Sequence, residues 1–312
     1  MDQAAASWIL SEGLAGLQTQ AIGLAEAAGL SPELRVLAPP PPWKWFAAKL
    51  WPKPLAAVAE AIEAPVPPLL ISCGGMAAVV GAALRCAGRS VVQIQHPRIN
   101  PRRFDLIIVN RHDGLTGPNV VVTRTALHRV TPARLAAEAD AWRERFVHLP
   151  RPLVAVLVGG SNGRFRLDRV VAARLGGDLA AIMQRDGAGV MVTPSRRTDW
   201  GVTEVLRETL EPCGGFVWDG SGKNPYFGML ALADAIVVTM DSVSMVSEAV
   251  ATAAPVLLAE LPGRSRRIQA FHQALLSEGR MRIFAGRLET WNVAPLNDTP
   301  LAGAELRRRL GV

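Results

Sequence analysis

One pattern recurs along the whole chain: a short run of consecutive apolar residues, a turn rich in glycine or serine, and then a stretch with helical periodicity. Runs that are apolar without alternation predict strands covered on both faces, and helices between them predict parallel order. The pattern therefore predicts an α/β fold with two Rossmann-like, doubly wound parallel-sheet domains that face a cleft. The expected strands lie at 7–10, 34–38, 69–73, 90–95, 105–110, 119–123, 153–159, 189–194, 215–219, 235–239, 255–260 and 281–285.

The domain boundary is expected near "RFVHLPRP", residues 145–152, where two prolines follow a polar helix that begins at about residue 132. A chain of 312 residues is long enough for two domains of ordinary size. We predict an N-terminal domain over residues 1–148 and a C-terminal domain over residues 149–312. The final helix belongs to the second domain by this division, with the alternative that it packs back on the first.

The net charge of +7 indicates an anionic partner. Nucleic acid is not predicted, because the chain has no lysine-rich tail, no zinc-finger spacing and no aromatic RNP-like strand. Phosphorylated small molecules and anionic lipid remain as partners. The three cysteines, Cys73, Cys86 and Cys213, form no CxxC or Cys/His cluster, so neither a disulfide framework nor a metal site is predicted. A start without a basic segment and an apolar stretch broken by prolines favour a cytoplasmic protein.

Two turns of the second half have anion-binding chemistry. In "VGGSNGRF", residues 158–165, the amides of Gly159, Gly160, Ser161 and Asn162 can cradle a phosphate, although the loop is neither a Walker A nor a GxGxxG motif. The alternative is a tight turn that caps a helix. In "SRRT", residues 195–198, two consecutive arginines can pair with phosphate, or they can be surface side chains of a solvated loop. These arginines are Arg196 and Arg197.

A third turn, "MDSVSMVSEA" at residues 240–249, offers both halves of a nucleotide site. Asp241, Ser244 and Glu248 recur at i, i+3 and i+7, so their side chains share one helical face. Asp241 or Ser242 can cap the helix, whose first turn can take a phosphate, and an acid two turns later can accept hydrogen bonds from a ribose. The alternative is a serine-rich cap followed by an exposed glutamate. With "DGSGKNPYFG" at residues 219–228, four consecutive turns with such chemistry lie at one sheet edge, which favours the ligand.

These motifs carry a family resemblance. "GKNPYFGMLALADAIVVTMDSVSMVSEA" followed by "APVLL", with "VGGSNG" upstream, is similar to the C-terminal nucleotide-sugar domain of GT-B glycosyltransferases, such as the transferase that makes lipid II. The stretches "SEGLAGLQTQ", "HPRINPRRFDLIIVNRHDGLTGPNV", "SRRT" and "NPYFGMLALAD" resemble the mitochondrial-fission elongated-mitochondria family, whose bacterial members are described as GT-B-like glycosyltransferases. That resemblance covers nearly the whole chain.

The resemblance implies a nucleotide-diphosphate sugar as donor substrate, with no metal and no cofactor required. It places the acceptor on the N-terminal domain and the donor on the C-terminal domain. A single acid on the ribose helix departs from better-defined relatives and leaves the nucleotide open. The implied contacts are the diphosphate near Gly160, Ser161, Ser242 and Ser244, the ribose near Glu248, and the base near Asn224 and Tyr226.

An inverting sugar transfer needs a base that deprotonates the acceptor hydroxyl. Three residues in turns of the first half are candidates: Asp113 in "RHDG" is the first choice, His96 in "QHPR" the second and Glu12 in "SEGLAG" the third. Asp113 precedes a glycine and can instead form an Asx turn, and His96 can be a loop histidine with a structural hydrogen bond.

The segment "PPPPWKWFAAKLWPKP", residues 39–54, interleaves aromatic and basic residues. Trp43, Trp45 and Trp51 with Lys44 have the composition of a contact with an anionic membrane surface, which would make the protein peripheral at the inner membrane face. The alternative is that the tryptophans pack against the first sheet under the lysine stems.

Three functions follow from these observations. The first is a GT-B-like glycosyltransferase that transfers a sugar to an unknown, lipid-linked acceptor. The second is a non-catalytic adaptor or regulatory protein with the same fold. The third, a Rossmann oxidoreductase or epimerase, is disfavoured, because the chain has no GxGxxG motif and its only tyrosine, Tyr226, is not part of a YxxxK pair.

Overall fold

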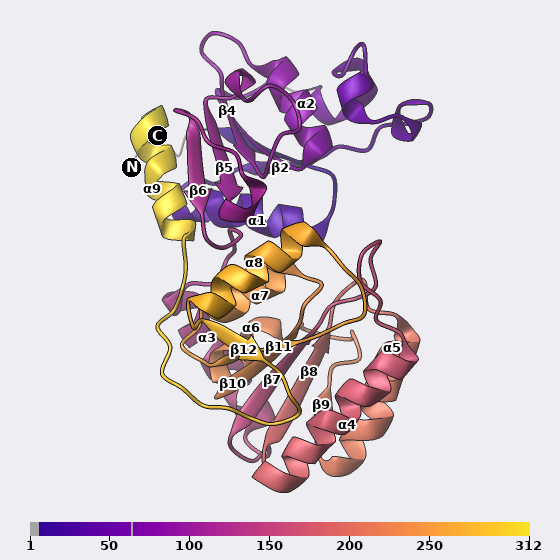
Figure 1. The fold of residues 1–312 in the computed structure, drawn as a ribbon. Coiled ribbons are helices and arrows are strands. Elements are labelled where there is room, and N and C mark those ends of the chain that lie inside the picture. The colour runs from indigo at the N-terminus through magenta and orange to yellow at the C-terminus, as the bar shows by residue number, and fades with distance from the viewer. Residues whose placement is uncertain (1–5, 64) are drawn as a thin grey trace. The chain divides into compact units, whose positions relative to one another are not determined.

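The computed structural model describes residues 6–63 and 65–312. These residues form two compact units (Figure 1). The first unit comprises the chain up to Arg129 together with Asn297–Val312, and the second comprises Val130–Leu296. Each unit contains one six-stranded parallel sheet, and the predicted α/β fold with two doubly wound sheets is confirmed.

The sheet of the first unit has the order β2-β1-β3-β4-β5-β6. Its strands are β1 (Ser7–Ser11), β2 (Glu33–Val36), β3 (Leu69–Cys73), β4 (Ser90–Ile94), β5 (Leu106–Asn110) and β6 (Val120–Thr123). Its helices are α1 (Ala15–Ala27), α2 (Gly75–Leu84) and α9 (Thr299–Leu310), with the 3₁₀ helices η1 (Trp43–Trp45), η2 (Ala48–Leu50), η3 (Ala56–Ile62), η4 (Pro101–Arg103) and η5 (Arg111–Asp113).

The continuous apolar runs are explained by two cores, one on each face of this sheet. Ile9 of β1 packs with α1 and α9, and the next residue, Leu10, packs with α2 on the other face. Successive side chains of a strand point to opposite faces, so a strand between two helical layers is apolar at consecutive positions rather than at alternate ones.

The sheet of the second unit has the order β12-β11-β10-β7-β8-β9. Its strands are β7 (Leu153–Val158), β8 (Gly189–Pro194), β9 (Phe216–Val217), β10 (Ala235–Thr239), β11 (Val256–Ala259) and β12 (Met281–Ile283). Its helices are α3 (Pro132–Phe146), α4 (Arg169–Asp186), α5 (Trp200–Leu210), η6 (Glu211–Cys213), α6 (Tyr226–Leu232), α7 (Val243–Val250) and α8 (Arg266–Ser277). Val156 of β7 faces α4 and α5, whereas its neighbour Leu157 joins the core on the α3 face.

The compact units divide after Arg129, whereas the sequence placed the boundary after residue 148. The difference is α3, which packs on α6 in the second unit. The contact is close, because a Cβ atom at Gly228 of α6 would lie 2.4 Å from Cδ1 of Trp142. Only a glycine at position 228 therefore permits this helix pair.

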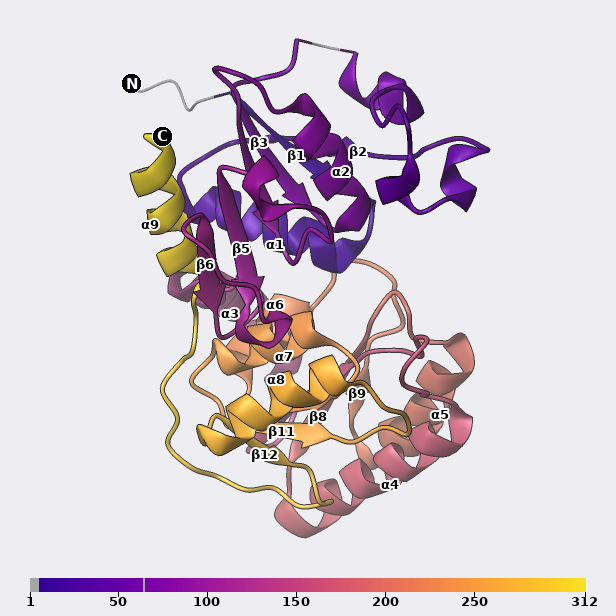
Figure 2. The same cartoon turned by 45° about the horizontal axis from the view of Figure 1, so that its top comes forward.

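The last helix, α9, packs on α1 in the first unit (Figures 1 and 2). Asp298, which precedes the helix, accepts hydrogen bonds from Arg124 N and from Arg124 Nη2, each at 2.6 Å. The Arg124 guanidinium lowers the pKa of the buried Asp298 carboxyl, against the opposing effect of burial. Among the described residues, no helix has the length and apolar character needed to cross a bilayer.

Candidate functional site

Three turns meet at the carboxyl edge of the second sheet, and Asp241 joins them. Its carboxylate accepts hydrogen bonds from Gly160 N at 3.0 Å, from Thr239 Oγ1 at 2.7 Å and from Arg197 Nη2 at 2.9 Å. The side chain of Asp241 is 0% exposed, whereas that of Arg197 is 45% exposed. Gly160 follows β7, Arg197 follows β8 and Asp241 follows β10, so one carboxylate ties together the ends of three strands.

Two glycines permit this close approach. A Cβ atom at Gly159 would lie 2.2 Å from Asp241 Oδ1, and a Cβ atom at Gly160 would lie 2.2 Å from the backbone oxygen of Arg197. Such distances are far below van der Waals contact, so both positions require glycine. The two glycines therefore allow the three turns to pack closely. We call the five residues that hold these turns together (Gly159, Gly160, Arg197, Thr239 and Asp241) the Asp241 brace.

The brace changes the expected role of the glycine amides. Gly159 N donates to Thr239 Oγ1 at 2.8 Å, and Gly160 N donates to Asp241. Both amides thus have acceptors within the protein, whereas the sequence predicted that they bind a phosphate. At Gly160 N, the acceptor is the carboxylate of Asp241 instead of the predicted ligand anion.

The rest of the glycine loop is also held by its own hydrogen bonds. Ser161 Oγ donates to Leu167 O at 3.0 Å and accepts from Leu167 N at 2.9 Å. Asn162 Oδ1 accepts from Arg164 N and Phe165 N, which forms a tight turn. The Ser161 side chain bonds within the loop, whereas Asn162 Nδ2 also donates to the backbone oxygen of Asp241 at 3.5 Å.

The first turn of α7 lies next to the brace. Ser242 is the N-cap, and its hydroxyl accepts from Met245 N at 3.3 Å. Ser242 and Ser244 are half-buried. The first amides of a helix have no acceptor within the helix, so this turn presents donors to an anion. Arg196 and Arg197 are exposed in the turn after β8.

Glu248 lies two turns along α7 and is only 6% exposed. Its Oε2 atom accepts a hydrogen bond from the hydroxyl of Tyr226, the first residue of α6. Asn224 is exposed, and its side chain accepts from Tyr226 N at 2.9 Å. The residues expected at the ribose and at the base are therefore bonded to each other, and Glu248 is buried rather than open to a ligand.

Burial raises the pKa of Glu248 from 4.5 to about 7, although the Tyr226 hydrogen bond acts in the opposite direction. Between about pH 4.5 and 7 the folded protein holds a proton on Glu248 that the unfolded chain has released, so folding is favoured at the acid end of this window. We expect the Glu248 contribution to the free energy of unfolding to fall by about 2 kcal/mol from pH 5 to pH 7.5. Glu248→Gln should remove this contribution, measured by urea unfolding at both pH values.

The control for this prediction is Glu260→Gln, which changes an exposed carboxyl of the same unit. Glu260→Gln should keep the full pH dependence of the wild type. If Glu248→Gln and the wild type change equally between pH 5 and pH 7.5, Glu248 does not hold a proton in the folded protein.

The three base candidates all follow strands of the first sheet. Glu12 follows β1 and is half-buried, and its Oε1 atom accepts from Met76 N, in the first turn of α2, at 2.8 Å. The carboxyl of Asp113 is 2% exposed and accepts from Asn110 N at 3.3 Å, which closes the turn η5. Asp113, the first choice from the sequence, is therefore a buried capping residue.

His96 presents a proton donor at its outer nitrogen. Its Nδ1 atom accepts from Arg98 N at 3.0 Å, so in the neutral ring the proton is on Nε2. The turn is strained, because Gln95 and Arg98 have φ angles of 71° and 60° and neither is a glycine. Such backbone is costly and is concentrated at functional sites.

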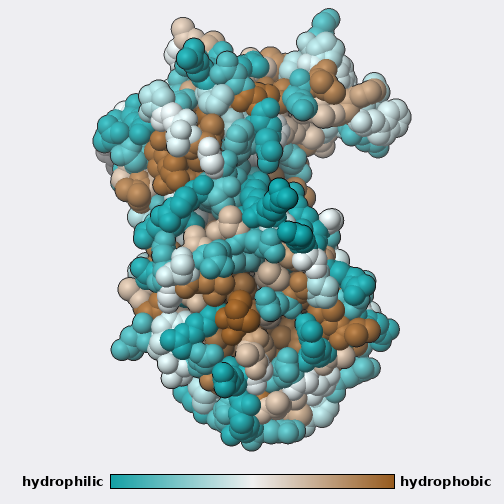
Figure 3. Space-filling model, in the orientation of Figure 1, coloured by the Kyte–Doolittle hydropathy of each residue, from teal (hydrophilic) through white to brown (hydrophobic). Residues whose placement is uncertain are grey.

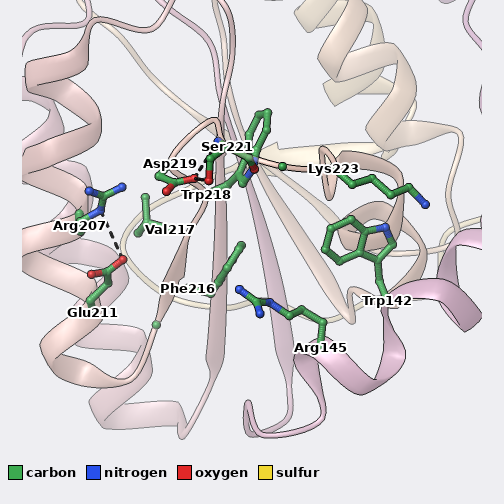
Figure 4. A pocket seen from close by; sticks show the side chains of 12 residues that line it. Trp142, Arg145, Arg207, Glu211, Phe216, Val217, Trp218, Asp219, Ser221 and Lys223 are labelled. Carbon is green, nitrogen blue, oxygen red and sulfur yellow. Dashed lines mark hydrogen bonds and ion pairs between the residues drawn. The ribbon is translucent and has the colours of Figure 1, made fainter.

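A separate groove of about 680 Å³ runs along the edge strand β9 of the second sheet (Figure 4). Trp142 and Arg145 of α3 line one side, and the ion pair of Arg207 with Glu211 lines the other. The loop 218–223 closes one end, where Asp219 accepts hydrogen bonds from Ser221. This groove is distinct from the Asp241 brace.

Two threonines that the sequence did not predict help to hold these turns, Thr239 within the brace and Thr198 beside it. Thr239 donates to Asp241, and Thr198 Oγ1 accepts from Ser195 N at 2.8 Å and donates to Val158 O at 3.1 Å. Each lies at the carboxyl end of a strand or in the turn after it, which is the only signal that could have found them. Among the residues that the structure describes, no three histidine, cysteine, aspartate or glutamate side chains are grouped as metal ligands.

Comparison with solved structures shows the fold. The chain superposes on the UDP-GlcNAc 2-epimerase of Methanocaldococcus jannaschii in complex with UDP-GlcNAc and UDP, with a TM-score of 0.60, 11% identity and coverage of 98% of this chain and 99% of that chain. Acinetobacter baumannii MurG gives a TM-score of 0.52 at 15% identity, covering 98% and 90%. Medicago truncatula UGT71G1 complexed with UDP-glucose gives 0.56 at 12% identity, covering 96% and 89%. The fold is GT-B-like.

Comparison of sequences identifies the family. The model of the family Mitochondrial fission ELM1 matches residues 15–310. The Arabidopsis thaliana protein named Mitochondrial fission protein ELM1 is 34% identical over 274 residues, which are 78% of this chain and 64% of that protein, so the chain spans less than two thirds of this relative. Uncharacterized protein RP120 of Rickettsia prowazekii is 26% identical over 74% of this chain and 77% of that protein. The chain belongs to the Mitochondrial fission ELM1 family.

Proposed function

We propose that the second unit binds the nucleoside diphosphate of a nucleotide sugar at the first turn of α7, and that the protein transfers the sugar to an acceptor hydroxyl. The observation that supports the proposal is the Asp241 brace, which holds Arg197 beside that turn. The buried carboxylate satisfies only part of the guanidinium, and the exposed remainder can pair with a phosphate. The diphosphate contacts would then be Arg197 and the first-turn groups around Ser242 and Ser244, rather than the glycine amides.

Uridine is the nucleotide we propose, because the names of the fold neighbours cited above include UDP, UDP-GlcNAc and UDP-glucose. Glu248 would reach a ribose only after Tyr226 gives up its hydrogen bond. The fold neighbours include epimerases as well as glycosyltransferases, and at 11–15% identity the likeness concerns the fold alone. The missing GxGxxG motif weighs only against enzymes that use a dinucleotide.

The base of such a transfer is proposed to be Glu12. Glu12 is half-buried and keeps a second carboxylate oxygen beyond the one that Met76 N engages, whereas the carboxyl of Asp113 is only 2% exposed. His96, with a proton on its outer nitrogen, would suit a hydrogen bond to an anion. Glu12→Gln keeps an acceptor for Met76 N, and it should lower kcat about 10² to 10⁴-fold with nucleotide affinity unchanged.

The acceptor is proposed to be lipid-linked, with the protein acting peripherally at a membrane surface and with no metal or cofactor in the reaction. A non-catalytic protein with the GT-B-like fold is the second candidate. It is favoured by the internal partners of the four predicted carboxylates, Glu12, Asp113, Asp241 and Glu248. Nucleotide binding by the second unit distinguishes the two.

The test is thermal unfolding with uridine, guanosine, cytidine and adenosine diphosphates. A ligand at about 100 times its Kd adds about 2.7 kcal/mol to the free energy of unfolding, so uridine diphosphate should raise Tm by about 5 to 10 °C. Val243→Pro removes one first-turn amide of α7 at a position where helices tolerate proline, and it should abolish the rise.

Arg266→Pro is the matched control, because it makes the same change at the first position of α8. It should keep the rise in Tm. If no diphosphate raises the Tm of the folded wild type, the non-catalytic candidate is supported. If Val243→Pro keeps the rise, nucleotide binds at another place.

A further inference from the structure

The segment 39–54 has two parts: tryptophans that pack on the first unit, and apolar side chains that are exposed. Trp51 is 6% exposed, and its Nε1 atom donates to Trp43 O at 3.1 Å and to Phe46 O at 3.2 Å. Trp43 is half-buried and contacts Trp51 edge-on, with ring centroids 6.0 Å apart. These two tryptophans fasten the segment to the first unit, so Trp51 is not available to a membrane, contrary to the expectation from the sequence.

Three other apolar side chains of the segment point into solvent. Trp45 is 71% exposed, Phe46 is 59% exposed and Leu50 is 66% exposed. We call Trp45, Phe46 and Leu50 the apolar tip. Figure 3 shows hydrophobic and hydrophilic atoms side by side over the region of this segment, at the upper right.

The charged residues within the segment 39–54 have one sign. Lys44, Lys49 and Lys53 are exposed, and no acidic residue lies between Glu33 and Glu60. The chain has only four lysines, so three of them lie within these ten residues, whereas arginine supplies the other cations. A flexible lysine stem can reach a lipid phosphate beside an inserted aromatic ring.

The segment is also ordered before any partner binds. The 3₁₀ helices η1 and η2 hold it, with Phe46 N bonded to Trp43 O at 3.2 Å and Leu50 N bonded to Ala47 O at 2.8 Å. The helix α2 packs against η2. A preformed loop loses little conformational freedom on binding, which favours a contact as small as this one.

We propose that the apolar tip and its three lysines form a docking surface for an anionic lipid bilayer. Trp45, Phe46 and Leu50 would enter the boundary between head groups and acyl chains, and the lysines would lie at the level of the lipid phosphates. This proposal adds a partner to the proposed function. It depends on that function only in assuming a lipid-linked acceptor. Vesicle binding is independent of nucleotide binding, so the two proposals can fail separately.

The test is sedimentation of the full chain in about 150 mM salt with two kinds of vesicle. One contains phosphatidylcholine alone, and the other contains phosphatidylcholine with 30% phosphatidylserine. We expect binding to the anionic vesicles and little binding to the neutral ones. Lys44→Ala, Lys49→Ala and Lys53→Ala combined should lower the partition coefficient about one-hundred-fold, because each lysine near such a surface contributes about fivefold. Trp45→Ser, Phe46→Ser and Leu50→Ser combined should abolish binding.

The control combines Val147→Ala, Val170→Ala and Trp200→Ala, three exposed apolar residues of the second unit. It should bind anionic vesicles as the wild type does. Since the substituted side chains are exposed, all variants should keep the wild-type Tm, and the apolar-tip variant should keep the Tm rise with uridine diphosphate if the wild type has one. Equal sedimentation of the apolar-tip variant and the wild type, absence of binding to anionic vesicles, or self-association through the tip in place of lipid binding would each overturn the proposal.

Discussion

Asp241→Ala should lower the free energy of unfolding of the second unit by about 3 to 5 kcal/mol. The substitution removes a fully buried carboxylate, leaves the buried amide of Gly160 and hydroxyl of Thr239 without their acceptor, and deprives the half-exposed Arg197 guanidinium of its ion-pair partner. Buried donors that lose a partner carry the full cost of desolvation. Urea unfolding followed by circular dichroism measures the change.

Two variants calibrate this result. Asp186→Ala removes an exposed partner of Arg185 in the same unit and should leave the urea midpoint unchanged. Asp241→Asn keeps an acceptor oxygen and should cost less than Asp241→Ala. A loss below about 1 kcal/mol for Asp241→Ala would show that the three turns are held together by other contacts.

The second large effect is expected for Gly160→Ala, which should destabilise the second unit by about 3 kcal/mol. The added Cβ atom would lie 2.2 Å from the backbone oxygen of Arg197 and 2.9 Å from Thr198 N. Backbone atoms of a bonded turn cannot move aside as a flexible side chain can, so the turn after β8 must shift. The shift would also displace Arg197 and remove nucleotide binding.

Gly163→Ala is the matched control, because it adds the same methyl group to the same loop where no atom lies within 4 Å. It should leave both the urea midpoint and the response to uridine diphosphate unchanged. Equal stability of Gly160→Ala and Gly163→Ala would contradict the tight packing of the turn.

The strands were predictable because each is determined by local composition. The run Leu153–Val158 is apolar at every position and Ala235–Thr239 at every position but the last, as is typical of a strand between two helical layers. The domain boundary was harder to predict from the sequence, because α3 is polar and is followed by prolines, and both features are typical of a linker region. Its membership in the second unit depends on the contact of Trp142 with Gly228, which lies 86 positions later in the sequence and gives no local signal.

The candidate site was predictable in its place but not in its hydrogen bonds. Parallel strands end at one edge, so the sequence could bring Gly160, Arg197 and Asp241 to the same region. Whether a polar side chain faces a ligand or a neighbour depends on tertiary geometry. Tyr226 and Glu248 are 22 positions apart on two helices, and no periodicity predicts that they bond to each other.

Under the proposed function, the second unit holds a nucleoside diphosphate at the turns around the Asp241 brace and α7. Hydrogen exchange of the full chain, followed by mass spectrometry of its peptides with and without saturating uridine diphosphate, tests it most directly. We expect slower exchange in residues 195–198 and 241–248 when the nucleotide is present. Protection confined to other segments, or identical exchange at nucleotide concentrations that saturate any shift in Tm, would contradict it.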